Sequence, residues 1–264
     1  MKRTHMLLID CQNDFCSPDG SLFVQGADQD MKRLSNLIGK IGDKISEFHV
    51  SLDSHNPVQI FFSSFWQDKM GNPPPSYTKI TAEDVAKGVW ETVNPQDQLK
   101  ALNYVQRLEA NGKELIVWPK HTIKGTLGHA LFPDISNALI NWSETTMREV
   151  NFCYKGDNKF TEMYSIFKAE VPDPTDQNTM LNGVLITRII AADEILIAGE
   201  ALSHCVKASV EDLINAVPQL ANRFILLEDC CSNVGGFEAY GNEFIDKIIK
   251  RGVRVMKSTD YLAA

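Results

Sequence analysis

The sequence predicts an α/β protein built on a parallel sheet that helices cover on both faces. Short apolar runs of strand length alternate along the chain with longer segments whose apolar residues recur every three or four positions. Several short runs are apolar at successive positions, as in strands that are buried on both faces. Alternation of this kind is typical of βαβ units in one sheet. We expect a single domain over residues 1–264, with an insertion at about 70–108 that contains three consecutive prolines.

The first half of the chain is expected to hold three strands and two helices. The strands are the apolar runs 6–9, 49–52 and 114–118, and the helices are 28–48 and 96–110. In the first helix, apolar residues fall at positions 31, 34, 37, 38, 41 and 45, which is a helical period. The second helix is closed by Asn111-Gly112, a pair that favours a helix C-terminus. The segment 70–81 is predicted to be a loop.

The second half continues the same alternation. Its predicted strands are 149–154, 194–198, 223–228 and 253–256, and its predicted helices are 128–142, 176–192, a helix from 203 onward, and 237–251. Ser203 is a plausible N-cap for the helix that carries Val206, Val210 and Leu213. This strand and helix pair places Cys205 in a first helical turn directly after a buried strand.

Reactive side chains follow nearly every predicted strand. They are Asp10, Asp53, His121, Lys155, Cys205 and Asp229. In parallel sheets covered on both faces, ligands bind beyond the carboxyl ends of the strands. One polar residue after a strand is ordinary in a loop, but a reactive group after most strands indicates a functional site. We therefore expect an active site at this edge of the sheet.

Cys205 is the candidate nucleophile. A helix N-terminus offers partial positive charge and unpaired N–H groups, which favour a thiolate and can hold an oxyanion beside it. A thiol nucleophile also needs a base and a neighbouring cation, and Asp10 and Lys155 could supply them. The structural alternative is that Cys205 is an inert core residue, that Asp10 caps a loop and that Lys155 is solvated.

Asp53, His55 and His121 are candidate metal ligands. Two imidazoles and one carboxylate suit a divalent ion that keeps open positions, with zinc as the first expectation and iron or manganese next. A carboxylate and a histidine two residues apart are common by chance. His129, inside a predicted helix, is interpreted as a structural histidine.

Three further side chains are candidate substrate contacts. Phe15 and Trp118 are apolar where the active edge of the sheet should be, so they either belong to the core or stack on a flat substrate. His204 precedes the candidate nucleophile, where it could form a pocket wall or a donor at the start of the helix.

Charge and composition exclude several classes of protein. The net charge of −8 argues against a nucleic-acid surface. The N-terminal apolar run is too short for a signal peptide, and no later run approaches membrane-spanning length. The six cysteines show no CxxC pair and no paired spacing, which favours a reduced, cytoplasmic setting.

The motifs taken together resemble the isochorismatase-like cysteine hydrolases, and within them the nicotinamidases. The resembling segments occur in the family's order and span most of the chain: Leu7 to Phe15, Leu52 to Pro57, Val117 to His121, Tyr154 to Gly156 with Glu162 to Ser165, and Ile197 to Ala208. The resemblance implies a three-layer αβα fold with a six-stranded, mostly parallel sheet. It also implies a dimer or larger homo-oligomer.

The resemblance further implies roles for particular residues. It implies a catalytic triad of Asp10, Lys155 and Cys205 and a metal held by Asp53, His55 and His121. A cis peptide at Glu200–Ala201 is implied as well, with the N–H groups of Ala201 and Cys205 as the oxyanion hole. Phe15 and Trp118 match the positions that line the ring pocket in nicotinamidases.

The chain also departs from the nicotinamidase pattern. Ser54 stands where nicotinamidases usually have Trp, Thr122 where they usually have Cys, and Ser203-His204 where they usually have a different pair before the nucleophile. The predicted function is cysteine-dependent hydrolysis of a small carboxamide through a thioester, with nicotinamide first and another small amide or carbamate next. The alternatives are vinyl ether hydrolysis of the isochorismatase type, which needs no thiol, and non-catalytic small-molecule binding, which needs none of Asp10, Lys155 and Cys205.

Overall fold

The central sheet of the computed structural model, which describes residues 2–263, has six strands. They lie in the order β10-β9-β8-β1-β2-β7, and every neighbouring pair is parallel. The strands are β1 (Thr4–Ile9), β2 (Ile45–Asp53), β7 (Asn151–Lys155), β8 (Glu194–Gly199), β9 (Phe224–Leu227) and β10 (Arg254–Met256). The six-stranded parallel sheet that we predicted is confirmed.

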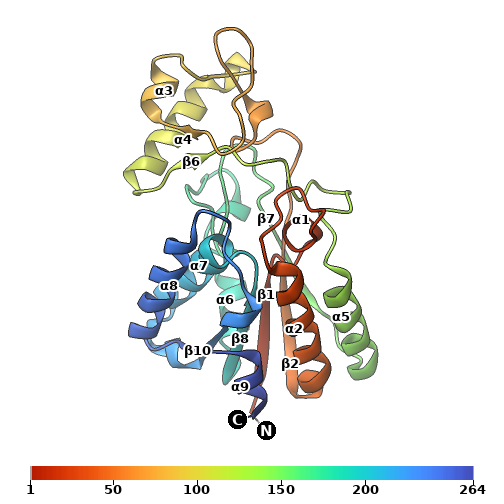
Figure 1. The fold of residues 1–264 in the computed structure, drawn as a ribbon. Coiled ribbons are helices and arrows are strands. Elements are labelled where there is room, and N and C mark those ends of the chain that lie inside the picture. The colour runs from red at the N-terminus through yellow and green to blue at the C-terminus, as the bar shows by residue number, and fades with distance from the viewer. Residues whose placement is uncertain (1, 264) are drawn as a thin grey trace.

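Helices cover both faces of this sheet and complete a three-layer αβα fold (Figure 1). One face carries α2 (Ala27–Ile41), α5 (Pro133–Thr146) and α9 (Ser258–Ala263), and the other carries α6 (Gly183–Ile189), α7 (Lys207–Ala216) and α8 (Glu238–Lys250). Because side chains alternate along a strand, β1 packs against the helices on both faces of the sheet. Met6 and Leu8 pack toward α2, while Leu7 and Ile9 pack toward α7.

A separate group of small elements lies beyond the carboxyl edge of the sheet, at the top of Figure 1. It contains α3 (Ala82–Ala86) and α4 (Gln98–Ala110), and two antiparallel pairs of short strands. The pairs are β3 (Trp66–Gln67) with β5 (Glu91–Thr92), and β4 (Lys79–Ile80) with β6 (Leu115–Ile116). The short helix α1 (Asn13–Cys16) follows β1 at the same edge. These elements cover the strand ends where the candidate site lies.

Three predicted helix boundaries were wrong. The helix predicted for 128–142 is α5 (Pro133–Thr146), so His129 lies before it and not inside it. The helix predicted for 28–48 ends at Ile41, and a 3₁₀ turn over Gly42–Lys44 leads into β2, whose Phe48 pairs with Met6. The segment after Lys44 instead pairs with β1 and is buried without a break from Phe48 to Asp53, as a strand inside a covered parallel sheet is. Only Gly183–Ile189 of the predicted helix 176–192 is α-helical, because the Asn182 side chain caps it by accepting from the Leu185 N–H.

The predicted strand 114–118 does not belong to the central sheet. Its residues Leu115 and Ile116 form β6, which pairs with β4 and not with β2 or β7. The sequence pattern shows that this run is buried, but the choice of pairing partner depends on where the segment 57–110 folds back. No helix among residues 2–263 is long and apolar enough to cross a membrane.

Candidate active site

Lys155 lies at the centre of the candidate site. It is the last residue of β7, in register with Asp53 of β2, and its side chain is buried. Its Nζ atom is 3.0 Å from Asp10 Oδ2, 2.9 Å from Asp53 Oδ1 and 3.7 Å from Cys205 Sγ. It also donates to the Met163 carbonyl at 3.0 Å. Burial lowers the pKa of Lys155, but the carboxylates of Asp10 and Asp53 raise it well above its usual range, so the ammonium stays protonated.

Asp10 directly follows β1 and is fully buried. Its backbone N–H donates to Ser51 Oγ at 3.0 Å, and the Ser51 hydroxyl donates back to Asp10 Oδ1 at 2.6 Å. The second carboxylate oxygen is therefore left to face Lys155. Burial raises the pKa of Asp10, and the opposing effect of the Lys155 ammonium does not cancel it. A carboxylate with a raised pKa is a better acceptor for a thiol proton than an ordinary aspartate.

Cys205 lies in a π-helical turn, Leu202–Val206, that runs into α7. The turn begins before Ser203, so the predicted N-cap role of Ser203 was wrong; its hydroxyl instead accepts from the Val234 N–H. The expectation of a favoured thiolate at rest was also wrong. Burial raises the pKa of Cys205 well above its usual range, although Lys155 opposes the shift. The resting group is a thiol, and its activation requires a base.

The turn that precedes Cys205 is shaped by close strand contact and a cis peptide. Gly199 ends β8 with φ 122°, and a Cβ there would lie 2.0 Å from the Ile9 carbonyl oxygen, so only glycine fits. The peptide Glu200–Ala201 is cis, as the resemblance implied. The Ala201 carbonyl accepts from His204 and Val206 N–H. Among the turn and loop hydrogen bonds of residues 2–263, the Ala201 N–H donates to no acceptor, as a donor to an oxyanion requires.

The structure brings Asp53, His55 and His121 together in a buried cluster. His55 Nδ1 donates to the Gly156 carbonyl at 2.8 Å, and His121 Nδ1 donates to the Pro119 carbonyl at 2.7 Å. A carbonyl only accepts, so in each neutral ring the lone pair is on Nε2. Those Nε2 atoms lie 2.7 Å and 3.5 Å from Asp53 Oδ2.

This arrangement fits a cation. His55 Nε2 is buried and makes no hydrogen bond, even though Asp53 Oδ2 is 2.7 Å away. Two lone-pair atoms at that separation repel each other unless a positive ion or a proton lies between them. Backbone carbonyls also orient both imidazoles, as is usual for histidines that bind a metal. The donor set therefore suits a divalent metal.

A narrow cavity of about 30 Å³ lies above these groups. Cys205, Asp53 and His121 line its floor, and Phe15, Trp118 and His204 line its walls. The Trp118 ring packs edge-on against His204, with their centroids 5.3 Å apart. Trp118 Nε1 also donates to the Tyr164 hydroxyl at 2.9 Å. The three predicted substrate contacts thus lie on one aromatic-walled cavity.

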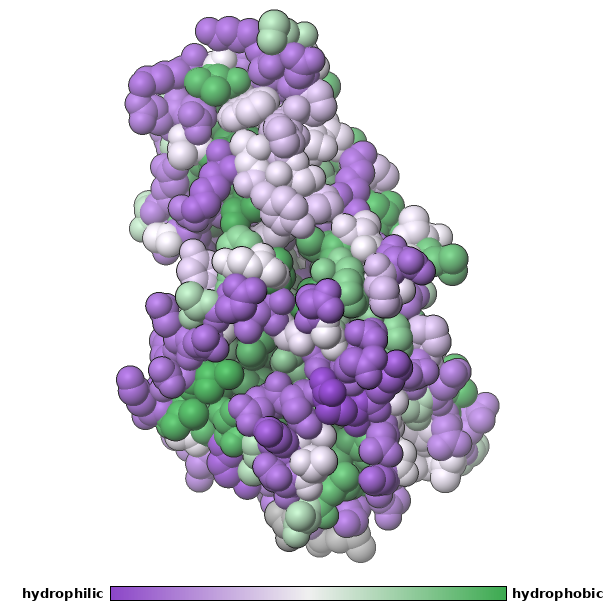
Figure 2. Space-filling view, in the orientation of Figure 1, coloured by the Kyte–Doolittle hydropathy of each residue, from purple (hydrophilic) through white to green (hydrophobic). Residues whose placement is uncertain are grey.

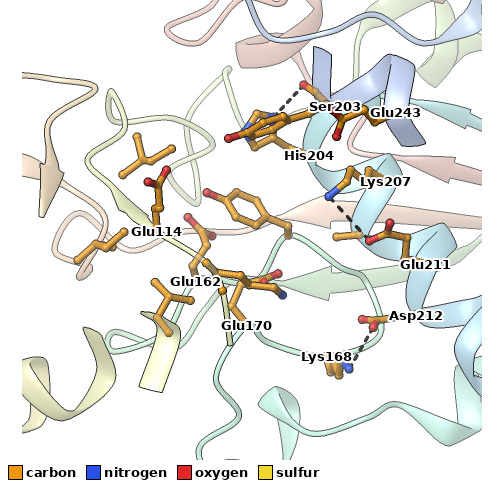
Figure 3. A pocket seen from close by; sticks show the side chains of 18 of the residues that line it. Glu114, Glu162, Lys168, Glu170, Ser203, His204, Lys207, Glu211, Asp212 and Glu243 are labelled. Carbon is orange, nitrogen blue, oxygen red and sulfur yellow. Dashed lines mark hydrogen bonds and ion pairs between the residues drawn. The ribbon is translucent and has the colours of Figure 1, made fainter. Parts of the chain in front are cut away.

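A larger groove of about 720 Å³ adjoins this cavity and shares Glu162, Tyr164 and His204 with it (Figure 3). Ion pairs between Lys207 and Glu211 and between Lys168 and Asp212 stand on its wall. Figure 2 shows a largely hydrophilic surface, with apolar side chains gathered between the upper elements and the sheet layers. The groove offers a polar approach to the aromatic cavity.

Sequence reasoning missed several residues of the site. Ser51 holds Asp10, and Gln12 joins the ends of β1 and β2 through bonds of 2.7 and 2.8 Å to the backbone N–H and carbonyl of Asp53. Glu162 lies on the cavity with Asp53, and burial raises its pKa to about 7. Only its place inside a resembling segment could have indicated Glu162.

Two other candidates lie outside the cavity. Asp229, expected at the active edge, instead accepts from the backbone N–H and hydroxyl of Ser258 at 2.7 and 2.8 Å. Its strand β9 lies beside β8, but the Asp229 carboxylate is held by Ser258 at the start of α9 and does not line the cavity. His129 Nε2 lies 2.7 Å from Ser54 Oγ, in the segment before α5, and belongs to neither group of candidate metal ligands among the described residues.

The buried Glu200 carboxyl gives a pH-dependent stability prediction. Burial raises the pKa of Glu200 well above its usual range, and Asp30 raises it further, so the folded chain keeps a proton that the unfolded chain loses. This proton makes its full contribution to the free energy of unfolding at pH values below the pKa of an unfolded glutamate. The contribution falls as the pH rises toward the folded pKa, by up to about 1.4 kcal/mol per pH unit.

Glu200→Gln removes this dependence, because an amide does not ionise. We expect the difference in Tm between Glu200→Gln and the wild type to grow in favour of the variant as the pH rises from about 5 to about 8. The difference should grow by about 2–4 °C for each kcal/mol of unfolding free energy that the wild type loses. Thermal melts at matched ionic strength measure this, with the exposed Glu144→Gln as the control. A Tm difference that stays constant with pH would contradict the buried, protonated state.

Comparison with known proteins agrees with this geometry. No family model matches the sequence. The chain is 27% identical over 206 residues to a nicotinamidase of Saccharomyces cerevisiae, and the match covers 77% of this chain and 78% of that protein. The structure of the yeast nicotinamidase bound to the inhibitor nicotinaldehyde has a TM-score of 0.66 at 22% identity, and covers 96% of this chain and 99% of that chain.

Two further solved structures share the fold. A pyrazinamidase of Pyrococcus horikoshii in complex with zinc has a TM-score of 0.56 at 17% identity, and covers 97% of this chain and 99% of that chain. An isochorismatase-like hydrolase from Alkaliphilus metalliredigens has a TM-score of 0.54 at 16% identity, and covers 99% of this chain and 98% of that chain. The chain therefore shares the fold of the isochorismatase-like hydrolases and nicotinamidases, and its sequence is similar to that of the yeast nicotinamidase.

Proposed function

We propose that the chain is a cysteine-dependent amidase that hydrolyses a small planar carboxamide through a thioester. The observation that carries this proposal is the position of the Lys155 ammonium, within 3.7 Å of Cys205 Sγ and 3.0 Å of Asp10 Oδ2. One buried cation thus serves both the thiol and its base. The wholly buried charge of Lys155 would be costly without such partners.

In the proposed reaction, Asp10 takes the proton of the Cys205 thiol as Sγ attacks the amide carbonyl carbon. The N–H groups of Ala201 and Cys205 hold the oxygen that becomes negative. The C–N bond breaks, and Asp10 passes its proton to the nitrogen, which leaves as ammonia. Water, with Asp10 again as base, then cleaves the thioester to give the carboxylic acid and the free thiol. Lys155 stabilises the negative charge that passes between Sγ and the carboxylate.

We propose that Asp53, His55 and His121 hold a divalent metal, with zinc as the first expectation. A bound ion would supply a Lewis-acid contact for a substrate atom at the cavity floor. The chain's own residues would hold the imidazoles in place through the Gly156 and Pro119 carbonyls.

The substrate is proposed to be nicotinamide or a similar aromatic amide. Phe15 and Trp118 present flat apolar surfaces to the same cavity that Cys205 and Ala201 line. The segment 70–108 supplies part of the adjoining groove, through Lys79 and Leu108. It could restrict the substrate to a different small amide or carbamate.

Release of ammonia from a panel of amides tests the substrate class. We expect kcat/KM for nicotinamide and pyrazinamide to exceed that for acetamide or propionamide by about 100-fold or more, because only the ring amides bury apolar surface in the cavity. Trp118→Leu should raise KM for the ring amides and leave acetamide hydrolysis almost unchanged. A preference for non-aromatic amides would contradict the aromatic substrate. Inactivity on every amide would favour vinyl ether hydrolysis or simple binding.

We also propose a homo-oligomer and a cytoplasmic location. The support for assembly is the family resemblance, together with side chains on the edge strand β7 that are exposed in the single chain, Phe152 and Tyr154. Light scattering after gel filtration measures the assembly, and a monomer at micromolar concentration would contradict it.

A further inference from the structure

A second group of metal-binding side chains lies at the amino end of the sheet, remote from the candidate active site. It consists of His5 on β1 and of Glu47 and His49 on β2. In the register of the two strands, His5 pairs with Glu47 and Leu7 pairs with His49. Asp10 and Asp53 stand at the carboxyl ends of the same two strands, which are labelled β1 and β2 in Figure 1. The mechanism described above uses none of these three residues.

Two of the three distances within this group match those between the ligands of a tetrahedral ion. His49 Nε2 is 3.2 Å from His5 Nδ1 and 3.3 Å from Glu47 Oε2. A tetrahedral zinc with bonds of about 2.0–2.1 Å sets its ligands about 3.3 Å apart. Two imidazole nitrogens and one carboxylate oxygen are also a ligand set that zinc accepts, with a fourth position left for water.

Hydrogen bonds pair only part of this group. His49 is fully buried, and its Nδ1 has no hydrogen-bond partner. The contact between His49 and His5 joins two rings, of which one nitrogen at most donates to the other. Leaving a buried polar atom unpaired costs about 1–3 kcal/mol. Nδ1 stays unpaired with or without an ion on Nε2, so it is the short distances from Nε2 to the His5 and Glu47 side chains that indicate a cation here.

The Glu47 side of this group is open to solvent, and the Arg188 guanidinium competes with a cation for the Glu47 carboxylate. The Glu47 side chain is 27% exposed, so the carboxylate forms the outer wall. Arg188 of α6 donates to Glu47 Oε2 at 3.0 Å and to Oε1 at 3.4 Å, and its side chain is 52% exposed. A cation that binds here must share Glu47 with Arg188 or displace the guanidinium, which has room to swing into solvent.

We propose that His5, Glu47 and His49 form a second divalent-cation site, of the kind that zinc occupies, which joins β1 to β2 at the amino end of the sheet. The site holds the ion through two neutral imidazoles and one carboxylate and performs no catalysis. Its effect is on stability, because an ion that binds only the folded chain raises the free energy of unfolding.

Metal content of the full-length chain tests this proposal. The protein is loaded with zinc, dialysed against metal-free buffer and measured by elemental analysis. We expect two ions per chain in the wild type, one in His55→Ala and one in Glu47→Gln, with none in the double variant. Glu47→Gln is the test variant because its side chain reaches solvent and its loss should not unfold the chain. It should also keep its amide turnover, since the site lies at the far end of the strands.

Arg188→Ala supplies a second and independent measurement. Removing the competing guanidinium should tighten zinc binding in the His55→Ala background by about 10-fold, seen as a lower Kd by titration calorimetry and a larger zinc-dependent rise in Tm. The exposed Lys32→Ala is the matched control and should change neither. The proposal is overturned if His55→Ala binds no zinc, or if Glu47→Gln binds as many ions as the wild type.

Discussion

Cys205→Ala is expected to lower kcat for amide hydrolysis by at least about 10⁴-fold while leaving the fold intact. The substitution removes one sulfur atom from the π-helical turn, and no other nucleophile lies within reach of Lys155 and Asp10 among the described residues that line the cavity. Without a thioester, water would have to attack the amide directly. Ammonia release at saturating substrate measures the loss, and circular dichroism with thermal melting checks the fold.

The other cysteines serve as controls for this experiment. Cys11 and Cys230 are buried and free, and burial raises the pKa of each above its usual range. Cys11→Ala and Cys230→Ala should therefore keep most of the turnover. Normal turnover in Cys205→Ala would show that the thiol mechanism is wrong, and an equal loss in all three variants would show only a general sensitivity of the core.

His55→Ala is expected to remove one divalent ion per chain and to reduce kcat/KM beyond the ~10–100-fold that mutation of an outer-shell partner costs at metal sites. His55 Nε2 is the buried atom with no hydrogen bond that faces Asp53 Oδ2, so its loss opens the cluster at its centre. Elemental analysis of protein purified without added metal gives the ion count. Ammonia release under the same conditions gives the activity.

His129→Ala is the matched control for the metal experiment. His129 lies next to Ser54, one residue from the cluster, but belongs to neither group of candidate ligands. It should keep both the ion and most of the activity. A wild-type protein that is fully active after removal of every metal would contradict the proposed role of Asp53, His55 and His121.

The local pattern of the sequence predicted most of the architecture. Continuous apolar runs such as Leu7 to Ile9 predicted strands buried on both faces, and six parallel strands with helices on both sides are confirmed. The carboxyl ends of parallel strands meet at one edge, so residue order alone leads one to expect Asp10, Lys155 and Cys205 close together. The fold does gather them, and their catalytic roles remain predictions.

Other features depended on contacts between distant parts of the chain. The run at 114–118 is apolar like a sheet strand, but it pairs with Lys79 and Ile80 because the segment between them folds back over the site. The helical position of Cys205 suggested a thiolate, yet the neutral thiol prevails, since desolvation by the surrounding core outweighs the nearby ammonium. No sequence pattern indicates how deeply a single sulfur atom is buried.

The sequence by itself determined the order of the elements and which reactive side chains stand at the ends of strands, because both follow from residue spacing along the chain. Only the tertiary structure decided the charge states of those side chains and their partners. Ser51 on Asp10, Glu162 on the cavity, and His5 against His49 are contacts across strands or loops, set by register and burial. Electrostatic energy depends on distance and solvent exposure in three dimensions, and neither quantity can be read from the order of residues along the chain.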